Sequence, residues 1–103
     1  MALTSCEYGE TTKTVWFTGA NETVTVNAGD FKTVNVSSSE DLTGYRLTGV
    51  LCASADYDKL QPKVVMKGFE CTNSTKNVVV TNYSTAAVQL NTSKVRICAL
   101  YVK

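Results

Sequence analysis

Short stretches in which β-branched residues alternate with polar ones are the feature that most constrains the fold of this chain. Clear examples are Thr23–Val26 (Thr-Val-Thr-Val) and Phe31–Val36 (Phe-Lys-Thr-Val-Asn-Val). Branching at Cβ restricts χ1, which disfavours helix and favours a pleated, half-buried strand. No apolar stripe with helical spacing competes with this pattern. The sequence therefore predicts an all-β protein.

The alternation predicts about eight short strands, separated by polar or turn-forming segments. They cover Thr14–Thr18, Thr23–Val26, Phe31–Val36, Tyr45–Ala53, Lys63–Thr72, Asn77–Thr81, Thr85–Leu90 and Lys94–Val102. Gly68 marks a candidate β-bulge in the fifth of them. Many short strands at near-even spacing are typical of a β-sandwich or a barrel. We predict an antiparallel β-sandwich with a jelly-roll-like arrangement.

The length of the chain predicts one domain with one thin core. Residues 1–103 fall near the commonest domain size, and a chain this short has little material to bury. The inward positions of the strands predict a core made of Val15, Phe17, Val24, Val26, Val34, Val36, Leu47, Leu51, Val88, Leu90, Val95 and Ile97.

Composition argues against an enzyme and against a nucleic-acid binder. The chain has no histidine, so neither a Ser/His/Asp nor a Cys/His catalytic set can be assembled. Ten basic residues face nine acidic ones, and the basic residues form no run. A nucleic-acid binder normally concentrates its positive charge on one face, so no nucleic-acid partner is predicted.

No segment of the sequence suggests a membrane partner. No stretch reaches the roughly 18 apolar residues that a membrane span requires. The first residues lack the charged and apolar regions of a signal peptide. We expect a chain that is made in the cytoplasm, or one supplied as a mature fragment with an added Met.

The four cysteines, Cys6, Cys52, Cys71 and Cys98, leave two interpretations open. They show no CxxC spacing and have no histidine companions, so no metal and no cofactor are predicted. Cys52 and Cys98 sit inside apolar runs, where a free cysteine behaves as a small hydrophobe. This favours free thiols, while an even count in a short chain keeps two disulfides as the alternative.

Two aromatic residues are candidates for binding. Trp16 is predicted to lie on the face opposite Val15 and Phe17, and Tyr57 lies in the longest segment without periodicity. An exposed Trp or Tyr ring can stack on a sugar. It can equally pack at a sheet edge or between subunits, and for Trp16 packing is the favoured interpretation.

Two segments are apolar on both faces. In the last predicted strand, one face carries Ile97 and Ala99 while the other carries Cys98, Leu100 and Val102; Val50–Ala53 shows a similar pattern. An antiparallel strand with one wet face should alternate cleanly. A chain this short has little material for a second cover, so the pattern predicts subunit packing. The predicted interface contains Val50, Cys52, Cys98, Leu100 and Val102.

Five Asn-x-Ser/Thr tripeptides begin at Asn21, Asn35, Asn73, Asn82 and Asn91. In a secreted eukaryotic protein they would be glycan acceptors. Because Thr, Ser and Asn are abundant throughout this chain, we attribute these tripeptides to composition.

From about residue 28 onward the chain resembles a small β-rich module of tail-fibre and baseplate proteins, the receptor-binding proteins of phages that infect Gram-positive gut bacteria. The resemblance rests on four segments: Ala28–Val36, Gly44–Val50, Asn77–Ser84 and the C-terminal Ala99–Lys103. In that family an Ala-Gly turn precedes a Lys/Thr/Val strand, and the last strand closes with Leu-Tyr-Val-Lys. No catalytic residue is carried over by these motifs.

The resemblance implies a non-enzymatic structural and adhesive module of a phage or prophage particle. Such a module would be exposed on the virion, form a homotrimer and help to attach to a host surface. The alternative function is a carbohydrate-binding module of a secreted bacterial protein, with a cell-surface glycan as its ligand. A trimer in solution would favour the first, and a monomer whose Trp16 or Tyr57 fluorescence responds to polysaccharide would favour the second.

Overall fold

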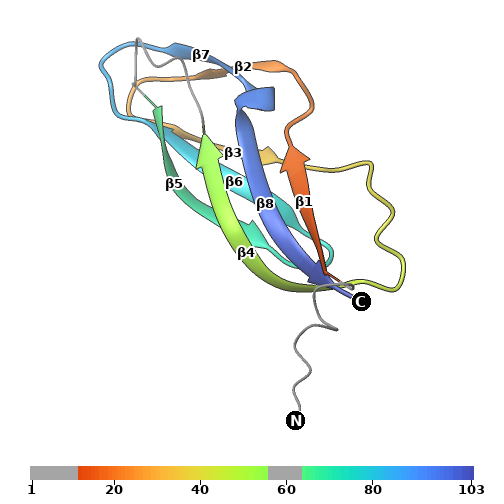
Figure 1. Ribbon diagram of the computed structural model, residues 1–103. Helices are drawn as coiled ribbons and strands as arrows, with labels where there is room; N and C mark the ends of the chain where they lie inside the picture. Colours follow the sequence, from red (N-terminus) through yellow and green to blue (C-terminus); the bar gives the residue numbers. More distant parts are fainter. Residues whose placement is uncertain (1–11, 56–63) are drawn as a thin grey trace.

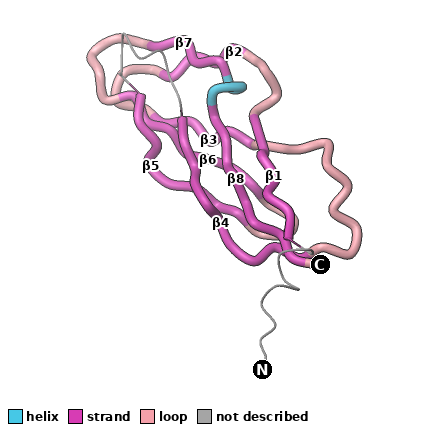
Figure 2. Tube along the Cα trace, viewed as in Figure 1, coloured by secondary structure: helices cyan, strands magenta, loops and turns pink. Residues whose placement is uncertain are grey.

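The structure is a computed structural model that describes residues 12–55 and 64–103, and this part of the chain is built from strands and one short 3-10 turn. Figure 2 shows this composition along the chain. The elements are β1 (Thr12–Thr18), β2 (Thr23–Val26), β3 (Phe31–Asn35), β4 (Arg46–Ala55), β5 (Val64–Cys71), β6 (Lys76–Asn82), β7 (Val88–Asn91), the 3-10 turn η1 (Thr92–Lys94) and β8 (Val95–Val102). The predicted all-β fold with eight strands is confirmed.

The strands form three antiparallel sheets with the orders β1-β8-β4, β3-β6-β5 and β2-β7. The pairs β1–β8, β2–β7 and β3–β6 are nested, as in a long hairpin that wraps over itself. The sheets β1-β8-β4 and β3-β6-β5 lie face to face, with β6 contacting both β4 and β8 (Figure 1). The β2-β7 pair lies across one end of this sandwich. The arrangement is the predicted β-sandwich.

The core lies between the two three-stranded sheets and also includes residues of the β2-β7 pair. Nine predicted core residues are buried: Val15, Phe17, Val26, Val34, Val36, Val88, Leu90, Val95 and Ile97. Val24 and Leu47 are partly buried against the same cluster. The core also includes residues that were not predicted for it: Val64, Val78, Val80, Ala99 and Tyr101.

Leu51 corrects the core prediction, because it is 57% exposed. Strand β4 has two register shifts, one between Leu47 and Gly49 and one between Val50 and Cys52. Each shift adds one residue, so the inward positions of β4 run Leu47, Val50 and Ala53 instead of every second residue. Strict alternation placed Leu51 inward and Val50 outward, and the bulges reverse both.

The predicted bulge at Gly68 is confirmed. The register of β5 against β6 shifts between Met66 and Gly68, which leaves Lys67 as the extra residue. Strand β5 is an edge of its sheet and carries three exposed apolar residues: Val65, Met66 and Phe69. A bulge and a lysine on an edge strand both discourage pairing with a foreign strand.

Two of the Asn-x-Ser tripeptides have a structural role in tight turns. The Asn82 Oδ1 accepts hydrogen bonds from the Ser84 backbone N–H and Oγ (2.9 and 2.6 Å), and Asn91 accepts the same pair from Ser93 (2.9 and 2.7 Å). Such bonds are the mechanism by which Asn favours turns. Asn82 is fully buried, which is incompatible with a glycan on the folded chain.

Gly19 is predicted to be intolerant of any side chain. It follows β1, and a Cβ placed on it would lie 2.1 Å from the carbonyl oxygen of Thr92. Because the clashing atom is backbone, we expect Gly19→Ala to lower the free energy of unfolding by about 1–3 kcal/mol, the usual cost of overpacking. Gly49→Ala is the matched control, since a Cβ placed on Gly49 would meet no atom within 4 Å beyond its own chain neighbours. Urea denaturation of the two variants measures the difference, and equal stability would contradict this assignment.

Candidate interaction face

The outward side of the sheet β1-β8-β4 gathers most of the predicted binding and interface residues; we call it the outer face. Partners across the three strands form four rows. In the order β1, β8, β4 these are Thr12, Val102, Arg46; Thr14, Leu100, Gly49; Trp16, Cys98, Cys52; and Thr18, Arg96, Ser54. The sequence predicted Cys52, Cys98, Leu100 and Val102 for an interface and Trp16 for binding. The structure brings all five onto one surface.

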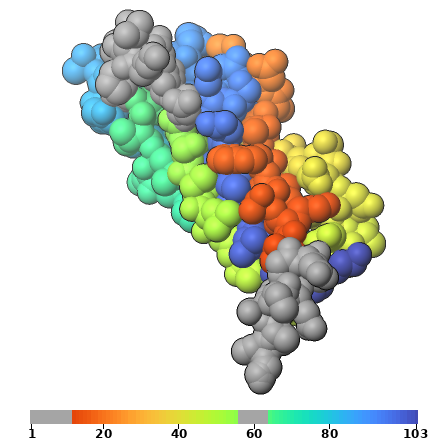
Figure 3. Space-filling view, in the orientation of Figure 1, coloured from red at the N-terminus to blue at the C-terminus, as the bar shows by residue number. Residues whose placement is uncertain are grey.

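The outer face explains why β8 is apolar on both sides. β8 is the central strand of its sheet, so the side chains of β1 and β4 flank its outward residues. Cys98 is only 6% exposed, while Leu100 and Val102 are half-buried. In Figure 3, β8 shows as a narrow blue strip between the green of β4 and the orange of β1. The chain thus covers part of this second apolar side itself.

Val50 does not belong to the outer face. It pairs with Ala99 and packs against the core, whereas its near neighbour Cys52 points outward. The reason is the second bulge of β4, which lies between them. The sequence-based interface is corrected on this point. Tyr57, the other predicted binding residue, lies outside the described residues.

Trp16 is the most prominent side chain on the outer face. It is 48% exposed and points away from Val15 and Phe17, as the alternation predicted. The Arg96 guanidinium carbon lies 5.1 Å from the centre of the Trp16 ring. A cation held over the face of an indole ring is attracted to its electrons. One side of the ring is therefore engaged within the chain, and the rest is available to a partner.

The cysteines of the described part of the chain are free thiols, as predicted. Cys52 is exposed, Cys71 is partly buried and Cys98 is buried. Burial raises the pKa of the Cys98 thiol above its ordinary value, and the neighbouring Cys52 raises it further. Burial likewise raises the pKa of Cys71. Both groups are consequently held in the uncharged form near neutral pH.

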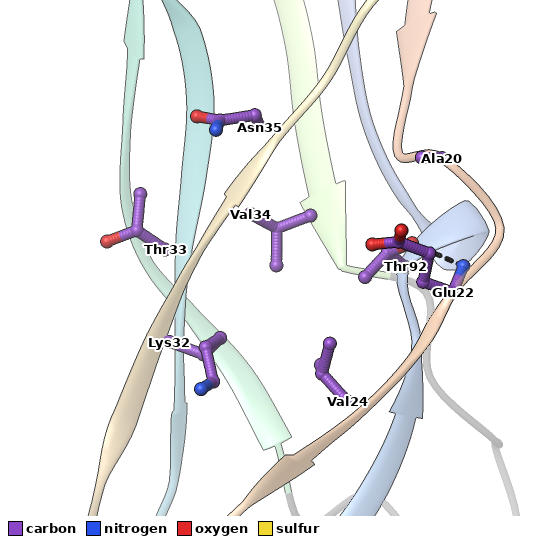
Figure 4. Close-up of a pocket in the computed structure, with 8 residues that line it drawn as sticks. All are labelled: Ala20, Glu22, Val24, Lys32, Thr33, Val34, Asn35 and Thr92. Carbon is purple, nitrogen blue, oxygen red and sulfur yellow. Dashed lines mark hydrogen bonds between the residues drawn. The ribbon is translucent and has the colours of Figure 1, made fainter.

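A pocket of about 320 Å³ lies away from the outer face, between β2, β3 and η1 (Figure 4). It is lined by Ala20, Glu22, Val24, Lys32, Thr33, Val34, Asn35 and Thr92. Thr92 anchors one wall, because its Oγ1 accepts a hydrogen bond of 2.9 Å from the Glu22 backbone N–H. The side chains of Val24, Val34, Glu22 and Lys32 contribute to this lining, whereas Thr33 and Asn35 point to the other side of β3 (Figure 4).

No pattern in the sequence pointed to this pocket. Strands β2 and β3 follow one another in the chain, but they belong to different sheets, and the pocket occupies the space between them. The alternation of residues within β2 and within β3 does not indicate that the two strands belong to different sheets. Among the described residues, no three side chains of the metal-ligating kinds gather into a cluster.

Comparison of the chain with models of known families, with curated proteins and with solved structures found no match. In the described part of the chain, no helix has the length and apolarity needed to cross a membrane.

Proposed function

We propose that the protein is a non-enzymatic structural and adhesive module of a phage or prophage particle, of the tail-fibre or baseplate type. In this proposal it is exposed on the virion, assembles as a homotrimer and contributes to attachment to the host surface. The particle type and the number three rest on the resemblance of four segments of the sequence. Self-association is supported by the exposed and half-buried apolar residues of the outer face.

The outer face is suited to contact with another protein surface. Its middle rows combine the half-exposed Trp16 with Leu100, Cys52 and Gly49, and only threonines flank them on β1. Exposed apolar groups that are contiguous on a sheet commonly mark interaction sites. Trp and Arg, here joined by a cation–π contact between Arg96 and Trp16, are also among the residues that most often dominate protein interfaces. A closed symmetric oligomer would cover this surface in every copy.

The opposite outer surface, on β3-β6-β5, is the poorer candidate. It exposes Phe31 and Val65, but the Lys67 ammonium lies 5.2 Å from the centre of the Phe31 ring. Asn35, Asn77 and Glu70 share that side of the sheet. Charged and amide side chains thus accompany the apolar ones, which is typical of a sheet face in contact with solvent.

Light scattering on the purified chain tests the proposal. We expect the mass of three chains at high micromolar concentration, and Leu100→Asp should give the mass of one chain. The reason is that an unpaired carboxylate is costly to bury in a subunit contact. Thr25→Asp is the matched control, because Thr25 is exposed on β2, away from the outer face, and should leave the assembly intact. Thermal melts of both variants verify that they remain folded, and Trp16→Ser provides a second disruption of the same contact.

A wild-type chain that stays monomeric at high concentration would contradict self-association. The carbohydrate-binding alternative then predicts that the fluorescence of Trp16 shifts when cell-wall polysaccharide is added, because half of its surface is open to a ligand.

A further inference from the structure

Two cysteines from neighbouring strands lie directly opposite each other on the outer face. Cys52 of β4 and Cys98 of β8 are register partners on adjacent antiparallel strands, and both side chains point to the outer face. Directly opposed residues of antiparallel strands have Cα atoms about 4.5 or 5.5 Å apart, depending on the type of pair. Both separations fall within the range of about 4.4–6.8 Å over which disulfides form. The spacing of register partners is therefore compatible with a disulfide between Cys52 and Cys98.

The second bulge of β4 aims Cys52 at Cys98. Val50 lies on the inner side, so strict alternation from Val50 would turn Cys52 inward as well. The register shift inserts Leu51 as the extra residue and returns Cys52 to the outer face. Re-aiming one side chain is a recognised consequence of a bulge.

The two thiols differ in their access to solvent. Cys52 is exposed, whereas Cys98 is 6% exposed and lies beneath the residues that flank β8. A dissolved oxidant can therefore reach Cys52 first, and Cys98 is placed to attack the sulfur of Cys52 afterwards. We propose that Cys52 and Cys98 form a reversible cross-strand disulfide, which makes the pair a redox-sensitive modification site. This inference goes beyond the proposed function, because both thiols belong to one chain.

The oxidant is a low-molecular-weight disulfide such as oxidised glutathione. The Cys52 thiolate attacks one sulfur atom of oxidised glutathione. The S–S bond of the glutathione disulfide breaks, and one glutathione thiolate leaves. Deprotonated Cys98 then attacks the Cys52 Sγ, forms the Cys52–Cys98 bond and releases the second glutathione. The two protons lost by the cysteines are taken up by the two glutathione thiolates, and the two electrons reduce the oxidant. Since burial raises the pKa of Cys98, this second step should accelerate as the pH rises.

The disulfide would tie the edge strand β4 to the centre of its sheet. It closes a loop that contains β5, β6 and β7, and closing a long loop restricts the unfolded chain. We therefore expect the oxidised form to melt several degrees above the reduced form.

The test incubates the full chain with oxidised glutathione after the reductant has been removed. The chain is used at a dilution at which light scattering gives the mass of one chain. We expect two thiols to disappear, the mass to fall by two hydrogens, and peptide mapping to find Cys52 joined to Cys98. Reduced glutathione should restore both thiols and the lower melting temperature.

Variants in a Cys6→Ser background identify the two roles. Cys98→Ser should retain one glutathione on Cys52, because no second thiol is placed to release it. Cys71→Ser is the matched control and should react as the parent chain does. The inference is overturned if the parent chain keeps glutathione on Cys52, if Cys52 links two chains, or if mapping finds no Cys52–Cys98 peptide.

Discussion

Replacing Ile97 by alanine should lower the free energy of unfolding by about 2–5 kcal/mol, the cost of emptying a fully buried aliphatic site. Ile97 is 0% exposed and lies at the centre of β8, where it pairs with Phe17 on one side and Ala53 on the other. Strands on both sides and the facing sheet limit how far the surroundings can relax into the cavity. Urea denaturation at neutral pH, with the midpoint and the slope both fitted, measures the loss.

Leu51→Ala is the matched control, because alternation in the sequence assigned both residues to the core. Leu51 is the extra residue of a bulge and 57% exposed, so we expect a change within about 0.5 kcal/mol. A large loss for Leu51→Ala, or a small one for Ile97→Ala, would show that β4 does not have the described register.

Replacing Asn82 by aspartate should be the most damaging isosteric change in the described part of the chain. The Asn82 Nδ2 donates to the carbonyl oxygens of Val26 (2.9 Å) and Ala86 (2.8 Å), and the side chain is fully buried. An aspartate would turn a carboxylate oxygen toward both acceptors. Losing two buried hydrogen bonds and placing a buried carboxylate oxygen against two carbonyl oxygens should cost at least about 3 kcal/mol at neutral pH.

The loss should depend on pH in a defined direction. Burial and the two carbonyl oxygens disfavour the charged form of this carboxyl, and the two hydrogen bonds from Ser84 favour it; we expect the first effect to be larger and to raise the pKa above the unfolded value of about 3.9. The penalty is therefore smallest below the unfolded pKa, where both states are protonated, and grows as the pH rises through the folded pKa. Thermal melts from pH 3 to pH 7, each compared with the wild type, follow this trend.

Asn91→Asp is the control for this second substitution. The hydrogen bonds of Asn91 to Ser93 are accepted by its Oδ1, and aspartate accepts them equally well. Asn91 is the N-cap residue of η1, and aspartate is as favourable as asparagine at an N-cap. We expect a change within about 0.5 kcal/mol. Equal losses for the two variants would mean that the donor bonds of Asn82 do not stabilise the fold.

Alternation was sufficient to predict the strands because it is a local property. In β1, Val15 and Phe17 point to one side and Trp16 to the other whatever the rest of the chain does, since successive side chains of a strand point to opposite faces. The same rule found the buried Val88 and Leu90 of β7, and the strand β6 that holds Val78 and Val80. Fold class, strand positions and most of the core follow from this rule.

The pairing of distant strands was decided only by the tertiary structure. The bulges of β4 appear only in its pairing with β8, and they determine that Val50 and Leu51 exchange sides and that Cys52 lies opposite Cys98. The partners of Asn82 and the pocket between β2 and β3 depend in the same way on which segments lie beside each other. A local pattern predicts which way a side chain points from its own strand. It carries no information about what lies opposite, because that depends on contacts between residues far apart in the chain.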